Sequence, residues 1–211
     1  MQPVEWADKL RNFSSISVRD DNSKKIIHQA LGFEPVMVLD PCLQFDVIPD
    51  ERVPHLTHPY LAVYGHNFSP FYIDAITKWS ATKQLPLVSI GYRNDWADEN
   101  WLTADPHDFA HFIAGATAMA TNFFHGCVFA LRNQIPFVCE SSAYRNNKVQ
   151  GLMTKIGGEL HLVNEQTNFS QYEAMLSKPV QSSILERIEE LRTVSSNYLQ
   201  QALLIPQTQR A

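Results

Sequence analysis

The segment Thr121–Gly126 (Thr-Asn-Phe-Phe-His-Gly) carries the residues best suited to chemistry. An apolar run precedes it and the helix-prone run Cys127–Leu131 follows it, which predicts that a strand, a tight turn and a helix meet at His125. Strands of an open α/β sheet bind ligands at their carboxyl ends, and the start of a helix offers free N–H groups to anions. We therefore expect His125 to transfer protons in an anion pocket, with Asn122 and Gly126 contacting the substrate.

Polar residues also follow other strands that the sequence predicts. Arg19 ends a strand-like segment, His66 follows an apolar run, and Lys148 stands near the start of a predicted helix. Right-handed crossovers between parallel strands bring such turns to one edge of a sheet, so we expect these side chains to gather around His125. Arg19 and Lys148 would hold a carboxylate or a phosphate there, and His66 would line the pocket.

Each of these residues also has a structural interpretation. Lys148 could be a solvated surface lysine, and His66 could be an ordinary turn residue. Ser23 is a candidate for substrate binding, but it also fits the first turn of a predicted helix. Arg19 could instead form a salt bridge with a nearby carboxylate, since a charged group at the end of a buried strand needs a partner. The candidates for that partner are Asp20, Asp21 and Asp40.

Short apolar strands alternate with helices along the chain, which is typical of parallel βαβ units. We therefore predict the α/β class, with a single doubly wound, mostly parallel, Rossmann-like sheet and helices on both faces. The predicted domain boundaries are an N-terminal helix at residues 1–12, the Rossmann-like domain at 13–180, and an amphipathic helix with its tail at 181–211. The proline-rich stretch that follows Asp40-Pro41, through about Pro59, is expected to be loop.

The chain has 211 residues, of which 45% are hydrophobic and 18% are charged, as in soluble globular proteins. A formal net charge of −5 argues against a broad nucleic-acid-binding face. The first residues lack the layout of a secretory signal, and no apolar stretch is long enough to cross a bilayer. Together with three cysteines in apolar surroundings, these features favour a cytoplasmic protein with reduced thiols.

Neither a cofactor nor a metal is expected from the sequence. His107 and His111 stand four residues apart, a spacing that can bind a metal, but no third ligand is apparent. A solvated helix flank is therefore the preferred interpretation of this pair. Trp96 and Trp101 fall in a predicted loop and are candidates for contact with a sugar.

Three blocks in order resemble the polysaccharide pyruvyl transferase family, over roughly residues 13–158. The first block runs from Ser17 through Arg19-Asp20 to Ser23, followed by Leu39-Asp40-Pro41. The second begins at Asp105-Pro106, contains Thr121–Gly126 and continues to Ile135-Pro136. The third is Tyr144–Lys148 with Gly151-Leu152.

The resemblance implies transfer of a pyruvyl unit from phosphoenolpyruvate to two hydroxyls of a sugar, as in exopolysaccharide biosynthesis. It also implies two facing Rossmann-like domains, of which this chain resembles the C-terminal one. A missing N-terminal domain or a partner subunit is then expected to complete the cleft. The family has arginine two residues before the histidine, where this chain has Phe123, and Arg145 is expected to supply the missing cation.

Two other functions stay open at the level of sequence. The chain could be the C-terminal half of a nucleotide-sugar glycosyltransferase, in which the turn Asn122–Gly126 would hold a diphosphate. It could also be a non-catalytic remnant that binds a glycan or a partner, an interpretation that Phe123 favours.

Overall fold

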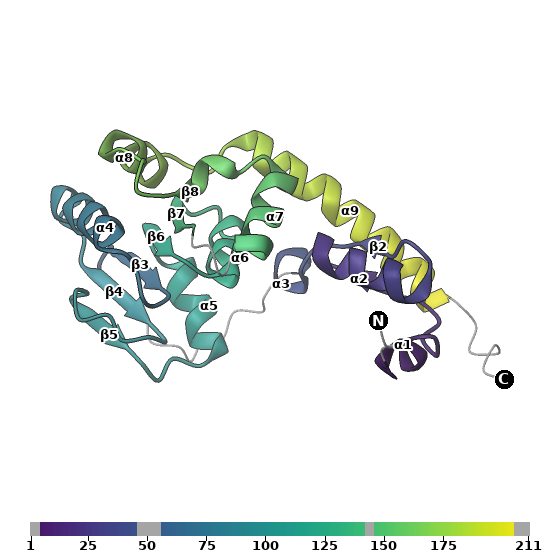
Figure 1. Ribbon diagram of the computed structural model, residues 1–211. Helices are drawn as coiled ribbons and strands as arrows, with labels where there is room; N and C mark the ends of the chain where they lie inside the picture. Colours follow the sequence, from purple (N-terminus) through teal and green to yellow (C-terminus); the bar gives the residue numbers. More distant parts are fainter. Residues whose placement is uncertain (1–4, 46–55, 142–145, 205–211) are drawn as a thin grey trace.

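The computed structural model describes residues 5–45, 56–141 and 146–204. Its main sheet is wholly parallel, with the strand order β5-β4-β3-β6-β7-β8 (Figure 1). The strands are β3 (Leu61–Tyr64), β4 (Leu87–Ile90), β5 (Glu99–Trp101), β6 (Ala118–Thr121), β7 (Phe137–Glu140) and β8 (Leu162–Val163). This order is that of a doubly wound Rossmann-like sheet, with its switch point between β3 and β6. The predicted fold class is confirmed.

Helices cover both faces of the main sheet. Leu61 and Val63 pack in one core cluster, while Ala62 packs in the other, as the alternation of side chains along a strand requires. Strands buried in this way are continuous apolar runs, which made them readable in the sequence. The face of Leu61 is covered by α4 (Pro70–Lys83) and α8 (Phe169–Ser177). The opposite face is covered by α5 (Pro106–Ala114), α6 (Phe124–Arg132) and α7 (Asn146–Ile156).

The N-terminal part of the chain forms a separate small sheet, so the expectation of a single sheet is wrong. Its strands β1 (Ser17–Val18) and β2 (Val36–Met37) pair in parallel, with Ser17 opposite Val36. The helices of this part are α1 (Glu5–Leu10), α2 (Asp21–Leu31) and α3 (Pro41–Gln44). Strand pairing depends on contacts between distant segments, and the local pattern that predicted β1 and β2 does not encode it.

The long helix α9 (Ser182–Leu204) joins the two parts (Figure 1). The short 3-10 turn η1 (Glu159–His161) precedes β8. Ile184 and Ile188 are buried in the core of the main sheet. Further along α9, Ser195 Oγ accepts a hydrogen bond from Leu39 N–H at 2.9 Å, and Tyr198 bonds the Ser15 hydroxyl at 2.6 Å. The predicted domain boundaries at residues 12 and 180 stay a prediction. Among the described helices, none has the length and apolar character that a membrane span requires.

Three elements fall in stretches that the sequence predicted as loop or left unassigned: α3, β5 and α8. Trp101 lies in β5, and its ring centroid is 4.9 Å from that of Phe112 in the core. The ring of Trp96 packs edge-on against Phe68 at 5.7 Å. The structure therefore gives both tryptophans a packing role, and contact with a sugar through them stays a prediction.

Candidate functional site

His125 lies in the first turn of α6, immediately beyond the carboxyl end of β6. The buried Thr121 fixes this turn, because its hydroxyl donates to Tyr64 O at 2.7 Å and accepts from Phe123 N–H at 3.1 Å. Gly126 lets the helix approach the strand: a Cβ there would lie 2.1 Å from Thr121 Oγ1. The sequence Thr-Asn-Phe-Phe-His-Gly thus aims His125 away from the core, and its side chain is 47% exposed.

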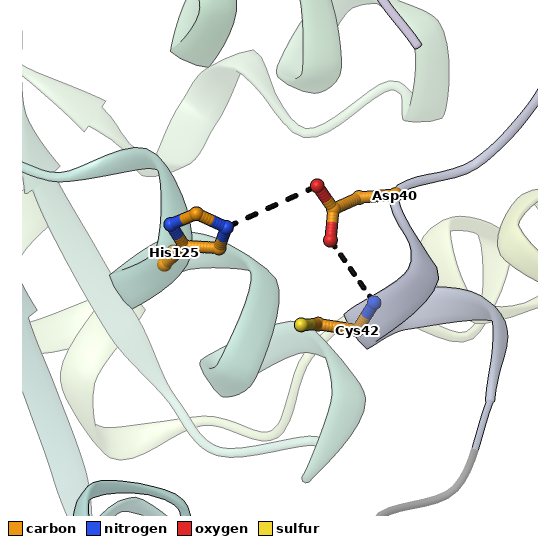
Figure 2. A group of neighbouring side chains, drawn as sticks. All are labelled: Asp40, Cys42 and His125. Carbon is orange, nitrogen blue, oxygen red and sulfur yellow. Dashed lines mark hydrogen bonds and ion pairs between the residues drawn. The ribbon is translucent and has the colours of Figure 1, made fainter. Parts of the chain in front are cut away.

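The partner of His125 is Asp40, a carboxylate from the N-terminal part of the chain. The side chain of Asp40 is only 2% exposed, and its Oδ2 lies 3.9 Å from His125 Nε2. Its Oδ1 accepts a hydrogen bond from Cys42 N–H at 3.0 Å, which caps α3 (Figure 2). The buried carboxylate therefore faces the imidazole and orients the ring.

Arg19 follows β1 and forms an ion pair with Oδ2 of Asp40. Its guanidinium carbon lies 5.5 Å from the ring centroid of Phe124, next to His125. Of the three carboxylates that the sequence offered to Arg19, the structure selects Asp40. Arg19, Asp40 and His125 therefore form one charged cluster that spans both parts of the molecule.

His125 borders a cavity of about 1090 Å³ between the small sheet and the main sheet. Among the described residues, its lining includes four lysines and two aspartates, although the whole chain has a net charge of −5. The lysines are Lys24, Lys25, Lys148 and Lys155, and the carboxylates are Asp20 and Asp21. The N-terminal ends of α2, α6 and α7 all contribute to the lining, and helix N-termini favour anions.

Electrostatic contacts link the α2 and α7 sides of this cavity. Burial alone would raise the pKa of Asp20, but hydrogen bonds from the N–H and hydroxyl of Ser23, each at 2.8 Å, outweigh it. The positive charges of Lys148 and Arg19 act in the same direction, so the pKa of Asp20 lies below its ordinary value. Asp20 is thus the N-cap of α2 and Ser23 is its hydrogen-bond partner in the first turn, while Lys148 is an exposed residue of the cavity lining.

Lys155 is a cavity residue that the sequence reasoning missed. Burial lowers the pKa of its ammonium group, Asp21 opposes this effect, and Arg187 adds to it. Lys155 and Lys148 both lie on α7, seven residues apart, so two helical turns place them on one face. That spacing was the signal available in the sequence.

One wall of the cavity is aromatic and contains Phe123. Its ring centroid lies 5.1 Å from that of Tyr64 and 5.2 Å from that of Tyr92, and all three residues line the cavity. His66 packs behind them, with its ring 5.4 Å from Phe123 and 5.1 Å from Tyr92. The position that the family resemblance assigns to an arginine is therefore part of an apolar ring cluster.

The remaining predicted site residues lie outside this lining, as far as the structure describes it. Asn122 is buried and donates from Nδ2 to the carbonyl of His66 at 2.9 Å, which ties the ends of β6 and β3 together. Gly126 contacts Thr121 in the core, so packing alone explains why glycine stands there. Arg145 lies outside the described residues.

Cys42 adds a thiol to the cluster around Asp40. Burial raises the pKa of Cys42 and the Asp40 carboxylate raises it further, while the positive charges of Arg132 and Arg19 oppose the rise. Donor atoms of Asp40, Cys42 and His125 lie within 4.8 Å of one another, and Figure 2 shows the thiol pointing toward the imidazole. Sequence reasoning included neither Asp40 nor Cys42 among the site residues, although Asp40-Pro41 is a recognisable helix start.

Fold and site together define a Rossmann-like α/β protein with a cationic cavity at the switch point of its sheet. A family model described as polysaccharide pyruvyl transferase matches residues 4–144. Because that match covers more than half of the chain, the chain belongs to the polysaccharide pyruvyl transferase family.

Comparisons with individual proteins are more distant. The crystal structure of the glycosyltransferase SnogD from Streptomyces nogalater aligns with a TM-score of 0.40 and 14% sequence identity. That alignment covers 87% of this chain and 61% of SnogD. No curated protein matches the chain.

Proposed function

We propose that this chain binds phosphoenolpyruvate in the cavity beside His125 and transfers its pyruvyl unit to two hydroxyls of a glycan. The observation that carries the proposal is the contact between His125 and the buried Asp40 at the edge of a lysine-rich cavity. Phosphoenolpyruvate carries a carboxylate and a phosphate, which match the excess of lysines and the helix N-termini. Membership of the family supplies the reaction class.

In this proposal Lys148 and Lys155 hold the anion, and His125 moves protons. One acceptor hydroxyl adds to C2 of phosphoenolpyruvate while a proton is added to its methylene carbon, which becomes a methyl group. The C2–O bond to phosphate then breaks, and the second hydroxyl adds to C2 to form the ketal. Of the two hydroxyl protons, the methyl group gains one and the released hydrogen phosphate carries the other.

Asp40 would act as a positioning residue in this reaction. Its carboxylate lies 3.9 Å from Nε2 of His125, and the N–H of Cys42 holds it in place. Its position beside the ring would orient His125 for proton transfer. Arg19, which is paired with Asp40, would hold the carboxylate in that position.

Thermal unfolding with and without phosphoenolpyruvate tests the binding step. A ligand present at 100 times its Kd stabilises the folded chain by about 2.7 kcal/mol. Lys148→Ala should remove most of this stabilisation at the same ligand concentration. The matched control is Lys9→Ala, which removes an exposed lysine from α1 and should leave the stabilisation intact. A wild-type chain that is stabilised by a nucleoside diphosphate and not by phosphoenolpyruvate would instead identify a glycosyltransferase.

A second candidate function is glycan binding without transfer, and Phe123 is the observation that favours it. A phenyl ring gives no paired N–H donors to an anion, whereas an aromatic wall suits the apolar face of a sugar. Under this alternative, oligosaccharides would stabilise the chain but no phosphate would be released from phosphoenolpyruvate in their presence.

A further inference from the structure

The side chains of Asp40, Cys42 and His125 form a group that includes a thiol for which the proposed pyruvyl transfer has no role. They offer a carboxylate oxygen, a thiol sulfur and an imidazole nitrogen, all within 4.8 Å of one another. The carboxylate is buried, the cysteine is half-buried and the histidine is exposed to the cavity. Thiolate, imidazole and carboxylate are the ligands that zinc binds in proteins.

The distance between His125 and Asp40 is close to what a tetrahedral ion requires. Ligand atoms at usual zinc bond lengths stand about 3.3–3.6 Å apart. His125 Nε2 and Asp40 Oδ2 are 3.9 Å apart, so a movement of a few tenths of an ångström in the exposed imidazole would complete the pair. Asp40 is already held by Cys42 N–H and Arg19, as outer hydrogen bonds hold metal ligands elsewhere.

From this arrangement we infer that Asp40, Cys42 and His125 bind a zinc ion. Two ligands come from the start of α3 and the third from the first turn of α6, so the ion would link the two parts of the molecule. Cys42 loses its proton to solvent when the metal binds, and the thiolate and carboxylate offset the charge of the ion, while Arg19 leaves one positive charge beside the carboxylate. The fourth coordination position is left for water or a ligand from the cavity.

Zinc at this site occupies Nε2 of His125 and thereby prevents proton transfer through that atom. The metal would therefore inhibit pyruvyl transfer, and this consequence alone rests on the proposed function. Zinc binding itself does not depend on it. The two ideas are separable, since binding is measured on the full chain without phosphoenolpyruvate.

Cobalt(II) reports directly on the thiolate, because a Co–S bond produces a charge-transfer absorption in the near ultraviolet. We expect this absorption to appear at one equivalent of Co²⁺ and to disappear when Zn²⁺ displaces the cobalt. Cys42→Ser should abolish it while far-ultraviolet circular dichroism shows an unchanged fold. His125→Ala should weaken metal binding by at least about 100-fold. Loss of a residue that only hydrogen-bonds to a metal ligand already costs about 10–100-fold in affinity, and His125 would be a ligand itself.

The control variant is His107→Ala. His107 occupies the second residue of α5, as His125 does in α6, but it is exposed and has no cysteine beside it. Its loss should leave the metal titration unchanged. The inference is overturned if folded wild-type chain gives no thiolate band, or if Cys42→Ser binds zinc as tightly as wild type.

Discussion

The two sheets of this molecule differ in how completely they are buried. In the main sheet, Leu61 and its neighbours on β3 are fully covered on both faces. In the small sheet, Val36 is 42% exposed, and Phe13 and Phe33, which precede β1 and β2 in sequence, are also exposed. The main sheet therefore supplies a rigid base, whereas the small sheet supplies charged groups at its border. The candidate site lies where the N-terminal part, which contains the small sheet, meets the switch point of the main sheet.

The division of roles is clearest at His125 and Asp40. The main sheet positions the imidazole of His125 through Thr121 and Gly126. The N-terminal part of the chain positions the carboxylate of Asp40 through α3. The contact between His125 and Asp40 therefore requires both parts of the chain. Chemistry should therefore depend on contacts between the parts, and stability should depend mainly on the main sheet.

The largest expected effect is on catalysis, in the variant Asp40→Asn. Asparagine can still accept the Cys42 N–H bond, but it carries no charge for His125 or Arg19. Phosphate release from phosphoenolpyruvate with glycan acceptors should fall by about 10²–10⁴-fold, because the amide no longer orients the histidine that transfers the proton. As a control, Asp98→Asn changes a carboxylate that accepts Leu87 N–H within the main sheet, and the rate should stay near that of wild type. Equal rates in Asp40→Asn and wild type would remove Asp40 from the account.

The second effect is on stability and contrasts the two sheets directly. Leu61→Ala should lower the free energy of unfolding by about 2–5 kcal/mol, because a fully buried leucine leaves a cavity. Val36→Ala, at a half-exposed position, should change it by less than about 0.5 kcal/mol. Urea denaturation of both variants measures the difference. Similar losses would mean that the small sheet is as tightly packed as the main one.

The third effect compares two helical glycines at the site. Gly126→Ala places a methyl group 2.1 Å from Thr121 Oγ1 and should destabilise the chain. Overpacking of this kind costs about 1–3 kcal/mol. Gly151 lies on α7, and the nearest atom to a Cβ added there is Asp21 Oδ2 at 4.0 Å. Gly151→Ala should therefore stabilise the helix by about 0.5–1 kcal/mol. Opposite signs in thermal unfolding are expected, and a neutral Gly126→Ala would contradict the close approach of α6 to β6.

The smallest effect is the pH dependence contributed by Asp20. The folded chain lowers its pKa, so ionised Asp20 stabilises the fold at pH values above the ordinary value of 3.8. That stabilisation is lost as the pH falls through the lower, folded-state pKa. Asp20→Asn keeps a capping oxygen but no charge, and should cost about 0.5 kcal/mol or less at neutral pH, because solvent screens the site. The difference from wild type should vanish in acid, and a difference that grows in acid would reverse the assigned sign.

The main sheet could be predicted from the sequence because its strands and helices are each encoded by short, local residue patterns. Buried parallel strands are apolar runs, and the helices between them carry start and stop signals such as Asp105-Pro106. Arg19 and His125 both lie beside Asp40, and Lys148 lines the same cavity as His125, whereas the roles that the sequence assigned to them stay predictions.

What the sequence could not settle is which distant groups become partners. Asp20, Asp21 and Asp40 were equivalent candidates for Arg19, and tertiary contacts alone select Asp40. For the same reason the separate pairing of β1 with β2 was missed. The sequence predicted that Gly126 contacts the substrate, whereas in the structure Gly126 lies against Thr121. That contact depends on how α6 packs against β6.

The central claim is that His125 moves the proton that converts the methylene of phosphoenolpyruvate into a methyl group. The direct measurement is transfer to a glycan acceptor in heavy water, followed by phosphate release and by deuterium in the product methyl group, for wild type and His125→Gln. Wild type should place one deuterium in each methyl group, while His125→Gln should bind phosphoenolpyruvate normally but react about 10²–10⁴-fold more slowly. A His125→Gln variant that releases phosphate at the wild-type rate would contradict the account.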